Sequence, residues 1–276
     1  MANITKALDL DALASGDSPI HRLEGRVKLV SCILIIVYCV FSSELIVPII
    51  LEIYLLILLY LSKLSFANSF KRILILLPFG GMIIIFQPFL QPGNVLWSYS
   101  WLQISDVGLN FAILLFARLI VSLTAIVILS STSPMEQIVA SFRKLKMPKD
   151  FAMILTIMVR FLFVFIDELE TIKKAQKSRN FNIHSKLTPY KWRLRQVGYS
   201  IAMMFLKSYE QGERTYQSMV SRGFSEHSQL FNEKTSLEKN DYIFIVSLIV
   251  VLAILTVIIF VFPEKLGYFG ENLALN

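Results

Sequence analysis

The sequence predicts an all-α membrane protein, and three observations carry that prediction. Of the 276 residues, 55% are hydrophobic and 17% are charged, whereas a soluble domain of this length has about a quarter charged residues. The apolar residues fall in long blocks, as membrane-spanning helices require. The basic residues gather between these blocks, where they set the orientation of the chain.

Five apolar blocks are candidates for membrane-spanning helices. They are Leu29–Phe41, Leu45–Leu61, Ile73–Leu90, Leu109–Leu129 and Tyr242–Phe262. A span needs about 20 apolar residues, so the last three fit and the first two are short. Basic residues precede the first block and follow the second, and both groups favour the cytoplasm. We therefore expect a tight hairpin of two spans there, and about five spans in the inner (plasma) membrane with a cytoplasmic N-terminus.

The distribution of charge divides the chain into three parts. The segment 131–241 holds 18 of the 27 Lys and Arg residues against 11 Asp and Glu, which predicts that it is cytoplasmic. We expect 1–130 to form a tail and four transmembrane helices, and 242–276 to form the last transmembrane helix and an outer tail. The loop Gln91–Gly108 has no Lys or Arg and carries interface aromatics, so we expect it outside.

The cytoplasmic segment is too long for a loop and predicts helices. We expect them over about Ser133–Leu145, Pro148–Arg179 and Pro189–Arg222. Ser133 is the expected N-cap of the first, with Pro134 at its first helical position. The apolar stretch Phe151–Ile166 is either a sixth span or a helix along the membrane face. We prefer the second, because a span would bury Arg160 in the bilayer.

The second and third of these helices end alike. Ser178-Arg179-Asn180-Phe181 ends one, and Ser221-Arg222-Gly223-Phe224 ends the other. Each places an arginine in the last turn, at the negative end of the helix dipole, before a residue that tolerates the left-handed conformation. Ordinary helix capping explains such a pattern too. The functional interpretation is two matched contacts for a symmetric partner or a pair of related subunits.

These motifs and others resemble those of a known family. The resemblance covers nearly the whole chain and rests on four stretches: Ser18–Leu29, Met158–Val164, Ala175–Phe181 and Ser218–Phe224. The first is similar to a His-Arg-Leu-Asp-Pro-Arg-x-Lys-Leu signature, with Glu24-Gly25 in place of Asp-Pro. The last two are similar to motifs with a central arginine, and Asn180 stands where glycine is usual. The chain resembles the transmembrane (T) component of energy-coupling factor (ECF) transporters, in the CbiQ-like cobalt and nickel branch.

The resemblance implies a coupling subunit without catalytic activity. Such a subunit joins two ATP-binding cassette ATPase subunits to a membrane substrate-binding (S) subunit, and its helices in 131–241 are the coupling helices. It implies that Ser178, Arg179 and Asn180 contact one ATPase and that Ser221, Arg222 and Gly223 contact the other. ATP-driven motion of the ATPases then reaches the S subunit, for uptake of cobalt or nickel.

The residues agree with this division of labour. The chain has no Gly-x-x-x-x-Gly-Lys-[Ser/Thr] motif to cradle ATP phosphates. It has no His-Glu-x-x-His and no spaced Cys/His cluster, so we expect neither a metal site nor a cofactor. Glu52 and Arg118 fall at similar depth in two predicted spans. We expect them to pair with each other, or each with a partner subunit, as buried structural charges.

Three other interpretations stay open. One is a T component that serves a vitamin or several substrate-binding proteins. Another is an intramembrane enzyme, which lacks a visible nucleophile–base pair. The third is nucleic-acid binding, which the modest basic excess of 131–241 disfavours, because basic helices beside a bilayer more often face anionic lipid.

Overall fold

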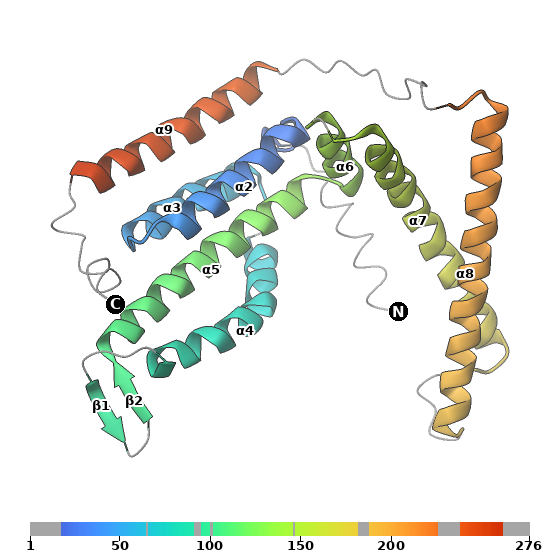
Figure 1. Cartoon of the computed structure of the whole chain (residues 1–276), viewed down its shortest axis with the longest axis horizontal. Helices are drawn as coiled ribbons and strands as arrows, with labels where there is room; N and C mark the ends of the chain where they lie inside the picture. Colours follow the sequence, from blue (N-terminus) through green and yellow to red (C-terminus); the bar gives the residue numbers. More distant parts are fainter. Residues whose placement is uncertain are drawn as a thin grey trace. The chain divides into compact units, whose positions relative to one another are not determined.

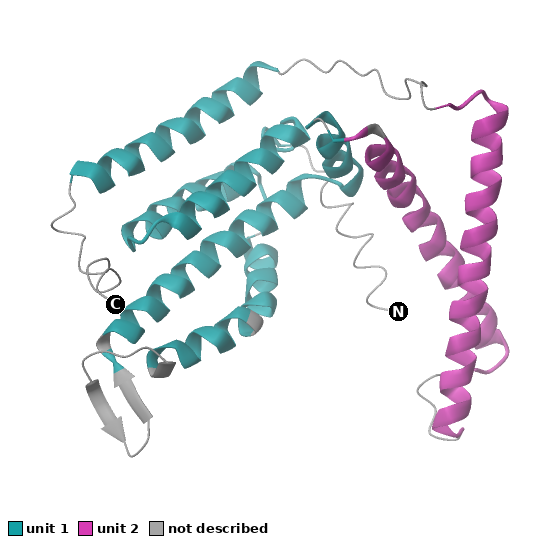
Figure 2. Ribbon diagram, in the orientation of Figure 1, with its two compact units in different colours: residues 1–147, 237–276 teal, residues 148–236 magenta. Residues whose placement is uncertain are grey.

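The computed structural model describes residues 18–64, 66–90, 95–99, 102–145, 147–181, 188–225 and 238–261. The chain forms two compact units, shown in Figure 2. Unit 1 comprises residues 1–147 and 237–276, and unit 2 comprises residues 148–236. Apart from one short β-hairpin, the regular elements in the described residues are helices, which confirms the predicted all-α class.

Unit 1 is a set of helices around one central helix, α5. Its helices are α2 (Gly25–Phe41), α3 (Ile46–Leu61), α4 (Phe66–Leu90), α5 (Asp106–Thr132), α6 (Met135–Lys144) and α9 (Lys239–Val261). Helix α5 packs against α2, α3 and α4 (Figure 1). Helix α2 also contacts α6 and α9. The start of α2 therefore touches the short helix that precedes unit 2, and α2 touches the helix that follows it.

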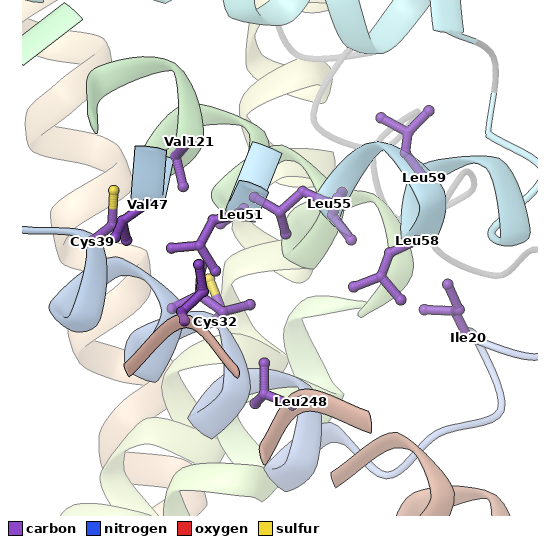
Figure 3. Close-up of a cluster of buried hydrophobic side chains, with 14 of the residues drawn as sticks. Ile20, Cys32, Cys39, Val47, Leu51, Leu55, Leu58, Leu59, Val121 and Leu248 are labelled. Atoms are coloured by element: carbon purple, nitrogen blue, oxygen red, sulfur yellow. The ribbon is translucent and has the colours of Figure 1, made fainter. Parts of the chain in front are cut away.

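The core of unit 1 is apolar and lies where α2, α3 and α5 meet (Figure 3). Cys39 from α2, Val47 and Leu51 from α3 and Val121 from α5 are almost fully buried. Leu255 of α9 joins the same cluster with no exposed surface. The cysteines are buried and free, in line with the interpretation of both as small core residues.

The outer surfaces of these helices are strongly apolar, as a bilayer requires. Residues Val107–Thr132 and helix α9 are each long and apolar enough to cross a membrane. Helix α4 is bent by 54° near Pro78, and it gives a third span if both of its halves belong to one crossing. A proline inside a helix removes one backbone hydrogen bond, which accounts for the bend. The membrane class is thus confirmed.

Helices α2 and α3 are shorter than a bilayer. They have 17 and 16 residues, or about 24–26 Å of helix, against a hydrocarbon core of about 30 Å. Both nevertheless contribute buried side chains to the core that α5 organises. The hairpin of two spans and the total of about five spans remain predictions.

A β-hairpin occupies part of the segment expected as an outer loop. Strands β1 (Val95–Tyr99) and β2 (Leu102–Ser105) pair in antiparallel fashion, with Trp97 opposite Ile104. Helix α5 follows β2 directly, and the Ser105 hydroxyl caps it by accepting the N–H of Gly108. This hairpin was not predicted from the sequence.

Unit 2 is an antiparallel pair of long helices, α7 (Lys149–Ser178) and α8 (Tyr190–Ser221). These bounds agree with the predicted helices to within about a residue. Three contacts tie the pair together. Gln176 donates a hydrogen bond to Ser200, Lys207 pairs with Glu168, and the Phe181 and Trp192 rings meet edge to face at 5.7 Å.

Candidate functional site

Helix α7 ends in a Schellman motif built around Asn180. The Phe181 N–H donates to the Gln176 carbonyl at 3.0 Å, and the Asn180 N–H donates to the Lys177 carbonyl at 3.0 Å. Asn180 has a φ of 59°, so it adopts the left-handed conformation predicted from the sequence. Asparagine tolerates this conformation better than other residues with a side chain. Arg179 is thereby fixed as the C-cap residue.

Helix α8 ends in the same motif. The Phe224 N–H donates to the Met219 carbonyl at 3.0 Å, and the Gly223 N–H donates to the Val220 carbonyl at 2.9 Å. Gly223 has a φ of 81°, where glycine carries no steric penalty. Arg222 is the C-cap residue. The two ends therefore match bond for bond, beyond the four-residue likeness in sequence.

Two further features are shared by these ends. The hydroxyls of Ser178 and Ser221, in the last helical residue of each, bond back to the carbonyl four residues earlier. Both C-cap arginines are exposed, and in the described chain no ion pair or hydrogen bond engages either guanidinium group. Two identical, rigid turns thus present two available cations.

The antiparallel pairing separates the two arginines. The contact between Phe181 and Trp192 places Arg179 beside the first third of α8, whereas Arg222 directly follows the last residue of α8. At 1.5 Å per residue, roughly 25 residues of helix place the arginines about 40 Å apart along α8. One subunit contacting both ends would have to be large, and two similar subunits, one at each end, fit more simply.

A second polar site, which was not predicted from the sequence, joins helix ends within unit 1. The Glu24 carboxylate accepts hydrogen bonds from Arg26 at 2.8 and 2.9 Å and from Lys144 of α6 at 3.0 Å. The backbone N–H of Glu24 donates to the Asp241 carboxylate of α9 at 2.9 Å. Partial burial favours a higher pKa for Glu24, but the hydrogen bonds from Arg26 and Lys144 outweigh it and hold the pKa below its ordinary value.

Lys28 extends this polar site to α5. Its ammonium group is buried and donates to the backbone carbonyls of Thr132, at 2.8 Å, and His21, at 3.2 Å. The carbonyl of Thr132 is at the C-terminal end of α5, where a cation is favoured by the helix dipole. Contacts of Glu24 and Lys28 therefore link α2, α5, α6 and α9. We name Glu24, Lys28, Lys144 and Asp241 the anchor cluster.

Gly25 allows α6 to approach this cluster closely. A Cβ atom at Gly25 would lie 2.9 Å from the Gln137 Cγ and 3.0 Å from the Gln137 carbonyl oxygen. Because α6 lies this close, a residue without a side chain suits position 25 in this chain. The family signature has proline at this position. The sequence signal for the anchor cluster was that charged residues lie at the edges of the apolar blocks. Spacing alone does not show which of these charged residues meet.

The prediction that Ser133 is the N-cap residue of α6 is wrong. Helix α6 begins at Met135 with Pro134 as its N-cap residue, not with Ser133. Ser133 instead ends α5, where its backbone N–H bonds to the Leu129 carbonyl. Its hydroxyl is buried without a hydrogen-bond partner in the described structure. Because α5 runs on to Thr132, the serine falls in the corner between two helices.

Glu52 and Arg118 each contact a neighbouring helix rather than each other. Thr124 of α5 donates to the Glu52 carboxylate at 2.9 Å. Arg118 of α5 donates to the Ser42 carbonyl at the end of α2. No ion pair between Glu52 and Arg118 occurs among the described contacts. The second Glu52 carboxylate oxygen and the Arg118 Nε are buried, and neither has a hydrogen-bond partner among the described residues.

No group of three His, Cys, Asp or Glu side chains is arranged as a metal site in the described residues. His21 lies among them, whereas His184 and His227 lie outside them.

The fold and these sites define an integral membrane protein with a pair of long helices that carries two matched arginine caps. Comparison with known proteins places it more closely. The family model described as CbiQ, cobalt transport protein, matches residues 16–233. The chain belongs to this family, and the resemblance seen in its motifs is confirmed.

Individual relatives cover most of the chain. An uncharacterized protein of Methanocaldococcus jannaschii is 26% identical over 243 residues, which cover 86% of this chain and 81% of the relative. The energy-coupling factor transporter transmembrane protein EcfT of Limosilactobacillus fermentum is 29% identical over 219 residues, or 75% and 80% of the two chains. The EcfT of Streptococcus thermophilus is 26% identical over 220 residues, or 76% and 82%.

Proposed function

We propose that this chain is the transmembrane coupling component of an ECF importer. In this role it joins two ATP-binding cassette ATPase subunits to a membrane substrate-binding subunit and does no catalysis itself. Family membership and the EcfT relatives support the transporter class. The structural observation that carries the proposal is the pair of identical Schellman ends, each with a C-cap arginine and no partner for it in the described chain.

The geometry supports a mechanical role. Two related ATPases offer two similar grooves, and two identical helix ends suit them. Arg179 enters one groove and Arg222 the other, where a planar guanidinium group forms bidentate bonds with carboxylates. Because Gln176–Ser200 and Lys207–Glu168 tie the helices together, closing of the ATPases moves α7 and α8 as a linked pair.

Helix α8 offers a surface for the substrate-binding subunit. None of its 32 residues is buried. Ile201, Phe205 and Tyr209 follow one another at helical spacing, and each is 65–70% exposed. Such a row of large exposed side chains is unusual on a surface that binds no partner. We propose that it packs against the membrane partner, and that motion of α8 reaches the substrate through it.

We propose cobalt or nickel as the transported substrate. The stretch Met158–Val164 resembles the metal branch, and the matching family is described as a cobalt transport protein. The EcfT relatives carry no substrate in their names, which keeps a vitamin or shared T component as the second candidate. Co-purification with a metal-specific membrane partner, against a vitamin-binding one, separates the two.

Co-purification with the candidate ATPases tests the coupling role. The variants are Arg179→Glu, Arg222→Glu and the double change, with Arg195→Glu as a control for an exposed arginine on α8. We expect each single change to weaken the complex and the double change to abolish it, while the control binds as wild type does. Equal binding by all variants would reduce both arginines to ordinary helix caps.

A further inference from the structure

A cleft of about 350 Å³ lies between α7 and α8 in unit 2. Arg160 lines it from α7, and Arg214 and Arg222 line it from α8. None of the described residues that line it is Asp or Glu. Three arginines therefore line one cavity whose size falls in the range of small-ligand sites.

The charges of these arginines are largely unanswered within the chain. Arg214 pairs with Glu210 at 3.1 Å, but both side chains are more than 60% exposed, so the pair contributes little. In the described residues, Arg160 and Arg222 have no side-chain hydrogen bond or ion pair. Like charges gathered around one cavity repel unless an anion lies between them. The cleft therefore favours an anionic ligand with several oxygens, because each guanidinium group binds oxygens in pairs.

Apart from the arginines, the cleft is lined by the polar residues Gln211, Thr215 and Ser218 of α8 and by an apolar wall. Ile157 and Phe161 of α7 and Met219 of α8 form this wall. On α7 this wall continues into Ile154 and Met158, which are 57% and 47% exposed. The cleft thus joins a cationic pocket to an exposed apolar stripe on the same helix. This combination fits an amphipathic ligand better than a carboxylate on a folded partner, which leaves the stripe in water.

We propose that this cleft binds the phosphodiester headgroup of an anionic phospholipid, with the acyl chains along the apolar stripe of α7. The phosphate accepts hydrogen bonds from Arg160 and Arg214, and Arg222 adds charge from the end of α8. Basic residues on an amphipathic helix attract anionic lipid in the same way at membrane surfaces. The proposal gives Arg160 a role outside the bilayer core, and it does not depend on ATPase docking.

Native mass spectrometry of the full chain tests this site. The delipidated protein is titrated with phosphatidylglycerol and, separately, with phosphatidylcholine of the same acyl chains. The pocket variant is Arg160→Gln/Arg214→Gln. The matched control is Lys174→Gln/Arg195→Gln, which removes two exposed charges from the same helices outside the cleft. Arg222 is left unchanged, because the ATPase proposal uses it.

We expect wild type and control to retain phosphatidylglycerol over phosphatidylcholine by roughly tenfold, and the pocket variant to lose this preference. Equal retention by pocket variant and control overturns the proposal. The proposal is also overturned if millimolar inorganic phosphate displaces the bound lipid and the protein shows no preference between the two lipids, because the cleft then binds free phosphate. If the pocket variant does not fold, crosslinking wild type with a photoreactive phosphatidylglycerol decides. Labelling at Ile154 and Met158 supports the site, and labelling confined to unit 1 refutes it.

Discussion

The buried carboxylate of Asp241 accepts a hydrogen bond at 2.9 Å from the backbone N–H of Glu24, 217 residues earlier in the chain. A second hydrogen bond, from the N–H of Glu238 to the Asp241 carboxylate, forms one half of a capping box at the start of α9. Lys144, which bonds to the Glu24 side chain, precedes unit 2 by a few residues, and Asp241 follows it by a few. The segments that enter and leave unit 2 are therefore both anchored to Glu24.

Replacing Asp241 by alanine tests this anchor. The change leaves two backbone N–H groups without their acceptor, and hydrogen bonds to a buried charge are individually strong. We expect the free energy of unfolding to fall by about 2–3 kcal/mol, measured by circular dichroism during denaturation in detergent. Asp150→Ala, at an exposed position at the start of α7, serves as control and should leave stability within about 0.5 kcal/mol. Equal effects of the two changes would remove any special role for Asp241.

Glu24 predicts a dependence of stability on pH. Its pKa is held below the ordinary value of 4.5 by Arg26 and Lys144 in the folded protein. The ionised carboxylate therefore stabilises the fold above pH 4.5, and this contribution is lost as pH falls through the lower folded pKa. We expect Glu24→Gln to melt at a lower temperature than wild type at pH 7, with the difference shrinking as the pH falls below 4.5. Glu136→Gln, at an exposed site, should show no such convergence, and a constant difference for Glu24→Gln would contradict the assignment.

The left-handed turn at the end of α8 predicts opposite effects for two glycines. Gly223 has a φ of 81°, so Gly223→Ala should destabilise the turn by about 1–2 kcal/mol. Gly212 lies within α8 with open space around it, so Gly212→Ala should stabilise the helix by about 0.5–1 kcal/mol. Hydrogen exchange at the Phe224 amide, which the turn protects, should quicken in the first variant and slow or stay unchanged in the second. Faster exchange in both variants would show that the turn is not what protects this amide.

A substitution at Thr124 tests whether Glu52 is a structural charge. Thr124 is fully buried and donates to the Glu52 carboxylate. Thr124→Val keeps the shape but removes the donor, which should cost about 1–3 kcal/mol of stability. Ser122→Ala, two residues away on α5, removes a hydroxyl bonded only to the backbone within the described structure and should cost less. If Thr124→Val leaves stability unchanged but reduces uptake in the assembled transporter, Glu52 has a functional rather than a structural role.

Local patterns predicted the helices and their ends well. The long apolar block of α9 and the proline and arginine boundaries of α7 and α8 were visible in the sequence, and the left-handed residues Asn180 and Gly223 follow from residue type alone. Such features depend on a few adjacent residues, whose backbone preferences act over short range.

The anchor cluster could not be predicted in the same way. Glu24, Lys144 and Asp241 come from three distant parts of the chain, and the packing of α2, α6 and α9 alone decides that they meet. For Glu52 and Arg118 the depth in the predicted spans was similar, yet each side chain found a partner on an adjacent helix. Depth in the membrane fixes only the height of a side chain along its helix. The direction in which the side chain points around the helix decides which neighbour it contacts.

The absence of buried residues in α8 has a consequence for the life of the protein in the cell. A copy made in excess of its partners displays Tyr190, Phe205 and Tyr209, each at least 65% exposed, along a helix that has no buried residue in the described structure. Quality-control proteases recognise stretches of this kind, and helices held by few contacts open readily for cleavage. The amount of this subunit in the membrane should therefore follow the supply of its partners, because assembly hides the surface that marks an orphan for destruction.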